Sequence, residues 1–412
     1  MICLRKTEKA LIPYSLFDFA NSSISLIIHA YLFPLYFKNH LLAGSKNGDA
    51  IWGALFSVSG IVAAVCAPFI GKVADGRGRY GVFFVLAWFS FITMLGLSLS
   101  IGTNVFLVSA LFIVMNIAFY FASNMYDSLI TLVASEASRA RFSSFAWGFG
   151  YLGGVVCFAG VFFLQSKWGN ASPIPYVFTA VFYLAFGAAS VLLLKPHVSG
   201  RIRNTSIPLA QMLQALTKAR IFLLIGYWLI ADCLSTIIFF TAIYGSSQLK
   251  LSDQAIGGIL LAVQLLAFPN TYLMSRLSEK IGLSRTLLVC VAIWLAVIAI
   301  LVFNTHLYGL YALAFLTSLV IGSTQALMRA QYSLYLEPLR TSELFGWYAI
   351  ITESSSILAP LLFGLVSVVF ASQRLAMALL ALPLVCGIIF VLRATSLLAK
   401  PKQEPPESAT TL

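Results

Sequence analysis

The chain has 412 residues, of which 60% are hydrophobic and only 10% are charged, and this composition excludes a water-soluble globular fold. The formal net charge is +12, which raises the question of a nucleic-acid partner. The basic residues are spread over short loops instead of forming a dense patch with exposed aromatic residues, so we expect no nucleic-acid partner.

Twelve long apolar stretches follow one another along the chain, and each can supply the ~20 mostly apolar residues that a membrane-spanning helix needs. The first stretch carries Asp18 and Asn21 and is too long and polar for a cleavable signal peptide. We predict an all-α, polytopic protein of the lipid bilayer with transmembrane helices at 13–37, 51–71, 80–101, 105–134, 142–166, 174–195, 220–246, 254–276, 283–304, 307–330, 344–370 and 374–395.

The charges between these stretches predict the orientation of the chain. Of the 26 Lys and Arg residues, all but five lie at the termini or in every second gap; the exceptions are Lys38, Lys46, Lys167, Lys250 and Arg374. The positive-inside rule then places both termini in the cytoplasm. An even number of spans also requires the two ends to share a side. We expect an integral protein of a bacterial inner membrane.

A long polar stretch divides the predicted helices six and six. We expect an N-terminal six-helix bundle over 1–195, a cytoplasmic linker over 196–219, a C-terminal six-helix bundle over 220–399 and a disordered cytoplasmic tail over 400–412. Several acidic and basic residues recur in the same order in both halves, which indicates duplication: Asp18 and Asp232, Glu136 and Glu337, Arg139 and Arg340. Two related six-helix halves are a common plan among transporters.

The segment after the second span reads Gly71-Lys-Val-Ala-Asp75-Gly-Arg-Gly78-Arg79 and resembles the G-x-x-x-D-x-x-G-R loop of the major facilitator superfamily. The resemblance implies transport by alternating access between two bundles. In this interpretation Gly71 allows close helix approach, and Asp75 binds a helix end or a basic partner to close one side. The alternative is a solvated basic turn that only sets topology. We assign gating to Gly71, Asp75, Gly78, Arg79, Asp127, Arg329, Glu136, Arg139, Glu337 and Arg340.

A narrower resemblance covers most of the chain. Phe17-Asp18-Phe19-Ala20-Asn21-Ser22 is similar to the opening of the vacuolar-effluxer-like facilitators, a group of autophagy-related effluxers and bacterial unknown major facilitators. The segments 322–329, 345–348 and 360–364 also match that branch. In the fungal relatives the resemblance implies amino-acid export from a vacuole. The chain departs from the pattern at four positions among the expected pore residues: Asp127, Ala231, Cys233 and Glu353.

Five ionisable residues lie inside the predicted spans: Asp18, Asp127, Asp232, Arg329 and Glu353. A charge at the bilayer centre costs at least ~2.5 kcal/mol, so such residues usually face a cavity or each other. The polar faces that these residues form predict a substrate or proton site of Asp18, Asn21, Asp232, Ser235, Glu353 and Gln325.

Each of these assignments has an alternative. Asp232 is either a substrate or proton site or a structural hydrogen-bond anchor, and Asp18 serves either binding or gating. Arg329 either pairs with Asp127 or reaches the membrane interface alone. Asp232 and Glu353, as carboxylates in a low-dielectric cavity, are candidates for proton coupling.

Motifs for other activities are missing from the sequence. No H-E-x-x-H and no G-x-x-x-x-G-K-[ST] occurs, and six scattered cysteines form no C-x-x-C, so we expect no enzyme, cofactor, metal site or ATP-driven transport. We predict a monomeric secondary active transporter for a small solute, with amino acids as candidates and ion coupling expected. A lipid-like substrate remains open. The alternative function is a transport-inactive membrane receptor or assembly protein that retains the fold.

Overall fold

The computed structural model describes residues 2–43, 45–134, 139–198, 217–303, 307–334 and 354–398. Within these ranges the regular structure is helical throughout. The elements are α1 (Ile2–Ser23), η1 (Ile24–Tyr31), α2 (Leu32–Tyr36), η2 (Phe37–Leu41), α3 (Gly48–Arg77), α4 (Arg79–Leu99), α5 (Val105–Val133), α6 (Arg139–Trp168), α7 (Ile174–Val198), α9 (Lys218–Ser247), α10 (Asp253–Ile281), α11 (Leu283–Phe303), α12 (Leu307–Val320), α13 (Ser323–Leu334), α15 (Leu358–Val369), α16 (Gln373–Leu379) and α17 (Ala381–Leu398).

The described part of the chain contains 11 helical stretches that are long and apolar enough to cross a membrane. They match the predicted spans except the eleventh, 344–370. Residues 335–353 lie outside the described ranges, and the described remainder of that span forms α15, a shorter apolar helix of 12 residues. The tenth span consists of α12 and α13, which are interrupted at Ile321 and Gly322.

The first span is longer than predicted, because helical structure continues from Ile2 to Leu41 instead of covering 13–37. Its middle, η1, is π-helical. Pro34 follows three residues after η1 and has no N–H to donate to the carbonyl of Ala30, so the regular α-helical ladder is broken at this place. The π-helical segment and the proline together change the direction in which the following side chains point.

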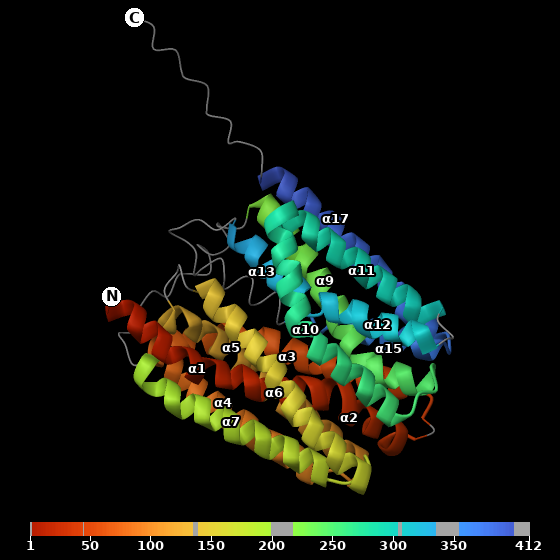
Figure 1. Ribbon diagram of the computed structural model, residues 1–412. Coiled ribbons are helices and arrows are strands. Elements are labelled where there is room, and N and C mark those ends of the chain that lie inside the picture. Colours follow the sequence, from red (N-terminus) through yellow and green to blue (C-terminus); the bar gives the residue numbers. More distant parts are fainter. Residues whose placement is uncertain are drawn as a thin grey trace, which may run out of the picture.

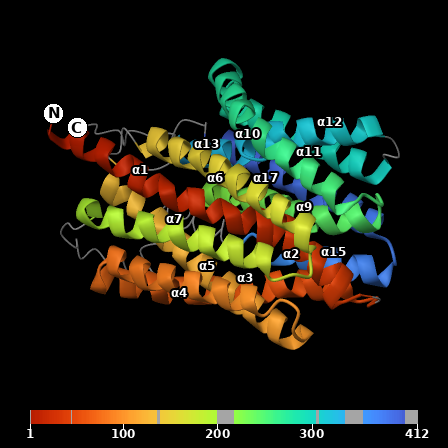
Figure 2. The same ribbon diagram turned by 60° about the horizontal axis from the view of Figure 1, so that its bottom comes forward.

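The helices form two groups that lie side by side along the molecule (Figure 1). In the N-terminal group, α1 to α7, the first helix packs against α6 and α7, and α4 packs against α5. In the C-terminal group, α9 to α17, the helices α9 and α17 pack together, as do α10 and α12. The two groups meet where α3 contacts α15 and where α6 contacts α10, and Figure 2 shows α6 beside α10 from a second direction.

Glycines permit the closest helix contacts between the described helices. A Cβ on Gly153 of α6 would lie 2.2 Å from the carbonyl oxygen of Phe19 in α1. Between the two groups, a Cβ on Gly53 of α3 would lie 2.2 Å from the carbonyl oxygen of Pro360 in α15. Neither backbone could approach so closely with a larger residue, so these glycines are required for the observed packing.

The molecule has two ends. The termini end is where α1 begins and α17 finishes. The far end is formed by the opposite helix ends and the described loop residues between them, which are 36–43, 45–49, 100–104, 165–173, 247–253 and 370–373.

Candidate functional site

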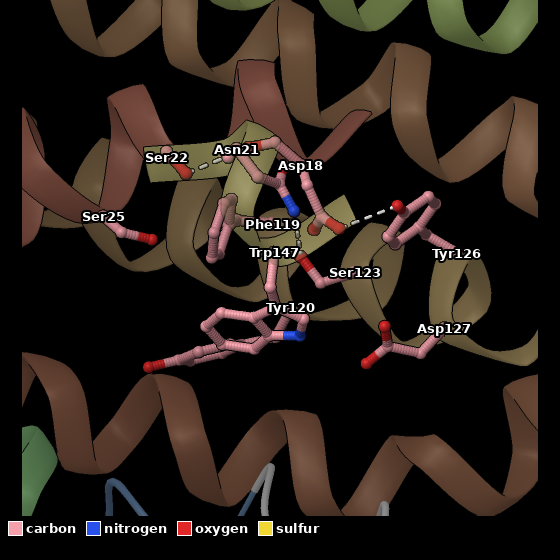
Figure 3. A pocket seen from close by; sticks show the side chains of 11 residues that line it. Asp18, Asn21, Ser22, Ser25, Phe119, Tyr120, Ser123, Tyr126, Asp127 and Trp147 are labelled. Atoms are coloured by element: carbon pink, nitrogen blue, oxygen red, sulfur yellow. Dashed lines mark hydrogen bonds between the residues drawn. The ribbon is translucent and has the colours of Figure 1, made fainter. Parts of the chain in front are cut away.

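A cavity of about 220 Å³ lies in the half of the molecule nearer the termini end. Figure 3 shows the side chains that line it. They come from α1, η1, α5 and α6 and are Asp18, Asn21, Ser22, Ser25, Phe119, Tyr120, Ser123, Tyr126, Asp127, Trp147 and Gly150. The volume is below the ~300 Å³ at which pockets for drug-sized ligands begin, so the cavity suits a small solute.

Asp18 lies in the cavity wall and is held by a tyrosine of α5. Its Oδ2 is 2.9 Å from the hydroxyl of Tyr126, which is also 3.0 Å from the backbone carbonyl oxygen of Tyr14. The Tyr126 hydroxyl carries one proton and has two acceptors within reach. Both contacts are satisfied if a protonated Asp18 donates to Tyr126 while Tyr126 donates to the carbonyl. The geometry therefore accommodates a proton on Asp18.

The second carboxyl group in the cavity belongs to Asp127, which is exposed there. Arg329 of α13 reaches this region from the C-terminal group, and its guanidinium lies 5.6 Å from the ring centroid of Trp147. Arg329 interacts electrostatically with both Asp18 and Asp127. The two acids and the one base are thus brought to one place, as their positions in the sequence suggested. A direct ion pair between Asp127 and Arg329 stays a prediction.

Polar side chains of α1 line the wall beside Asp18. Asn21 donates from Nδ2 to the hydroxyl oxygen of Ser123 in α5, at 3.0 Å, and its Oδ1 is buried without a hydrogen-bond partner. Ser22 donates to the carbonyl oxygen of Asp18, and Ser25 is exposed. The predicted polar face of the first helix therefore does line the cavity.

Asp232 does not line this cavity, although we expected it to share a chamber with Asp18. The residue is buried in α9, and its Oδ2 accepts a hydrogen bond of 2.8 Å from the backbone N–H of Ala359 in the first turn of α15. Backbone N–H groups in the first turn of a helix have no partner within that helix, and a carboxylate satisfies them. This contact fits the alternative interpretation, a structural anchor. Ser235 and Gln325 are half-buried and lie outside the cavity lining as well.

Several predicted gating residues lie outside the part of the chain that the structure describes. These are Glu136, Glu337, Arg340 and, from the predicted substrate site, Glu353; the side chains of Asp75 and Arg139 are also outside it. Gly78 has φ +95° and joins α3 to α4, and Arg79 begins α4. The close helix approach expected at Gly71 is not found, since a Cβ there would meet no described atom within 4 Å.

Two polar clusters join the helix groups at the far end. In one, Asp49 of α3 pairs with Lys38, and its Oδ2 accepts hydrogen bonds of 2.5 Å from Ser367 and from Gln373 of the C-terminal group. In the other, Asp253 of α10 accepts a hydrogen bond from Asn170 of the N-terminal group.

The second cluster continues into the N-terminal group. Gln165 donates to Asn170 at 2.5 Å, and the hydroxyl of Tyr31 donates to Gln165 at 2.6 Å. Between the two clusters, the indole of Trp52 donates to the carbonyl oxygen of Phe239 at 3.0 Å. The far end is therefore closed by contacts between the two groups, while the cavity lies toward the termini end.

Sequence reasoning missed five side chains of the cavity wall, Phe119, Tyr120, Ser123, Tyr126 and Trp147. Tyr120 and Ser123 precede Asp127 by seven and four residues, which places all three on one face of a helix. That spacing was a usable signal. Asp49 and Asp253 were also missed, because an acid in the first turn of a helix is common on any protein surface.

A membrane transporter of the major facilitator type is the class of protein that this fold and cavity define. Over residues 133–402 the chain matches the family described as "Vacuole effluxer Atg22 like", and it belongs to that family. The predicted fold class and the predicted branch of the superfamily are thereby confirmed.

Individual relatives agree with this assignment. The chain is 26% identical over 406 residues to "Uncharacterized MFS-type transporter YxiO" of Bacillus subtilis, which covers 91% of this chain and 92% of that protein. It is 29% identical over 184 residues to "Autophagy-related protein 22" of Kluyveromyces lactis, which covers 42% of this chain and 37% of that protein.

Solved structures are similar in fold. Nucleoside transporter NupG superposes with a TM-score of 0.67 at 12% identity, over 96% of this chain and 99% of that one. The human organic anion transporter MFSD10 gives a TM-score of 0.68 at 14% identity, over 94% and 99% of the two chains. At these identities the likeness concerns the fold alone.

Proposed function

We propose that the chain carries a small polar solute across a membrane by alternating access and exchanges a proton at Asp18. The observation that carries the proposal is the cavity with two carboxyl groups near one end of the molecule, while the other end is sealed by contacts between the two helix groups. A path that is closed on one side and hollow on the other is what alternating access requires.

The chemistry of the cavity favours a solute with a cationic group. Asp18 and Asp127 provide two carboxyl groups, and Trp147 and Tyr120 provide aromatic faces that attract cations. Arg329 at the same place would receive a carboxylate of the solute. Amino acids combine these two groups at a size that fits the cavity.

Proton exchange is supported by the contact between Asp18 and Tyr126. Solute and proton would compete for the Asp18 carboxyl, since a cationic group binds the ionised form and a proton neutralises it. Competition at one group couples the two movements. The predicted cytoplasmic position of the basic loops puts the cavity on the cytoplasmic side, which supports our proposal of an inward-facing state. We further propose that the protein acts as a monomer in a bacterial inner membrane.

The test is a binding screen followed by transport. We expect purified protein to be stabilised against thermal unfolding by at least one amino acid, by mass action, and to be unaffected by nucleosides and sugars. In proteoliposomes, uptake of that amino acid should respond to an imposed pH gradient, and Asp18→Asn should remove the response. Arg393→Gln, an exposed change on α17, is the control. Uptake that ignores the pH gradient in the unchanged protein would contradict proton exchange.

A further inference from the structure

Two rows of polar side chains run along α1 and α5 with the same spacing. On the first helix they stand at steps of four, three and four residues: Asp18, Ser22, Ser25 and His29. On α5 the same steps occur in the reverse direction: Asp127, Ser123, Tyr120 and Asn116. The steps on α5 follow one face of an α-helix. On the first helix, Asp18 and Ser22 lie in α1, whereas Ser25 and His29 lie in the π-helical η1, and the cavity lining shows that the first three face the cavity. The first helix leaves the termini end and α5 approaches it, so the two rows run antiparallel, and positions of equal rank from that end are called levels.

The cavity covers only the first three levels of these rows. All six side chains of those levels line it, whereas His29 and Asn116 do not. His29 contacts Phe119, which is part of the cavity wall, with ring centroids 5.4 Å apart. The fourth level therefore lies directly behind Phe119, one step further toward the far end.

The fourth level is polar, and both of its side chains, His29 and Asn116, are buried. His29 is 4% exposed and Asn116 is 0% exposed. His29 and Asn116 interact with each other, but Nε2 of His29 and both polar atoms of the Asn116 amide are buried without a well-formed hydrogen bond. A buried polar group without a partner costs about 1–3 kcal/mol, so apolar residues would give a more stable protein here. Buried polar side chains of this kind are retained in proteins where another molecule supplies their hydrogen-bond partners.

Four aromatic rings enclose the imidazole, and they come from both helix groups. Ring centroids of Phe56, Phe112, Phe119 and Phe239 lie 5.4, 6.4, 5.4 and 5.7 Å from that of His29. Phe56 of α3 and Phe239 of α9 stack on each other across the interface, with centroids 3.7 Å apart. Separation of the two groups at the far end must pull this pair apart and open the enclosure.

We propose that His29 and Asn116 form a second solute-binding step on the transport path, reached when Phe56 and Phe239 separate. The step takes an uncharged hydrogen-bonding group of the solute. A full charge would lose its hydration among the four rings, whereas imidazole and amide offer both donors and acceptors. This inference rests on the proposed function, since a path without a solute needs no second step.

Access to the fourth level is measured without knowledge of the solute. The full chain, with its six cysteines replaced by serine or alanine, receives Asn116→Cys and is treated in liposomes with the water-soluble thiol reagent 2-sulfonatoethyl methanethiosulfonate. Met115→Cys is the matched control, because it is the adjacent residue and is also 0% exposed. We expect labelling of Asn116→Cys to be at least about tenfold faster, since labelling follows the population of the open state. Equal rates would overturn the proposal.

Stability separates a binding role from a structural one. His29→Leu and Asn116→Leu remove buried polar atoms without a well-formed hydrogen bond, so each variant should melt at the same temperature as the parent or higher. Transport of a solute identified in the binding screen should fall by at least about tenfold. A tenfold loss corresponds to a loss of about 1.4 kcal/mol in the binding free energy of the solute. A lowered melting temperature in both variants would show that His29 and Asn116 have a structural role and would contradict the inference.

The outcome also distinguishes this inference from the proposed function. If the unchanged protein transports a solute while Asn116→Cys is labelled no faster than Met115→Cys, the function stands and the second step fails. If Asn116→Cys is labelled rapidly but no solute stabilises or crosses, the proposed function fails and with it the reason for a second step.

Discussion

Asp49→Asn is expected to open the far end of the molecule. The carboxylate of Asp49 is buried and accepts hydrogen bonds of 2.5 Å from Ser367 and Gln373, both in the opposite helix group. A hydrogen bond to a charged acceptor contributes ~1.5–3 kcal/mol and one to a neutral acceptor ~0.5–1.5 kcal/mol, so each loses about 1 kcal/mol. Together they shift the equilibrium by about 2 kcal/mol, or about 30-fold, toward the state that is open at the far end.

The shift is measured as a distance between the two groups. Spin labels at Ala171 and Phe370, exposed residues of the far end on opposite groups, report the separation by pulsed electron resonance. We expect a longer distance to gain population in Asp49→Asn. Ser367→Ala removes one of the two contacts and should produce a smaller shift in the same direction. An unchanged distance distribution in Asp49→Asn would refute the reasoning that these contacts close the far end.

Three further changes test other parts of the structure. Gly53→Ala places a Cβ 2.2 Å from the Pro360 carbonyl oxygen, so the same spin-label distance should lengthen, whereas a normal distance would show that the backbones yield. Asp232→Ala removes the carboxylate at the start of α15 and should lower stability by about 1 kcal/mol, measured as a lower melting temperature, with solute affinity preserved. Tyr126→Phe removes a hydrogen bond to Asp18 and should alter the pH dependence of uptake more than it alters stability, and an unchanged pH profile would count against proton exchange at Asp18.

Hydropathy and charge are local properties, so the sequence by itself determined the membrane-spanning segments. A stretch such as 80–101 must be helical in lipid, because its backbone groups find no other partners there. The loop at 71–79, together with the twelve spans, indicated the superfamily. The opening at Phe17–Ser22, together with the segments 322–329, 345–348 and 360–364, indicated the branch. The polar face of Asp18, Asn21 and Ser22 was also readable, since helical spacing alone puts these residues together.

The roles of single acids were decided only by the tertiary structure. Asp18, Asp49 and Asp232 are each an acid in an apolar helix, yet one lines a cavity, one closes the far end and one binds the first turn of α15. A carboxyl group buried in a membrane protein can be satisfied by water in a cavity, by a donor on another helix or by a helix N-terminus. Asp232 and Ala359 are 127 residues apart, and no local pattern shows that packing brings them together.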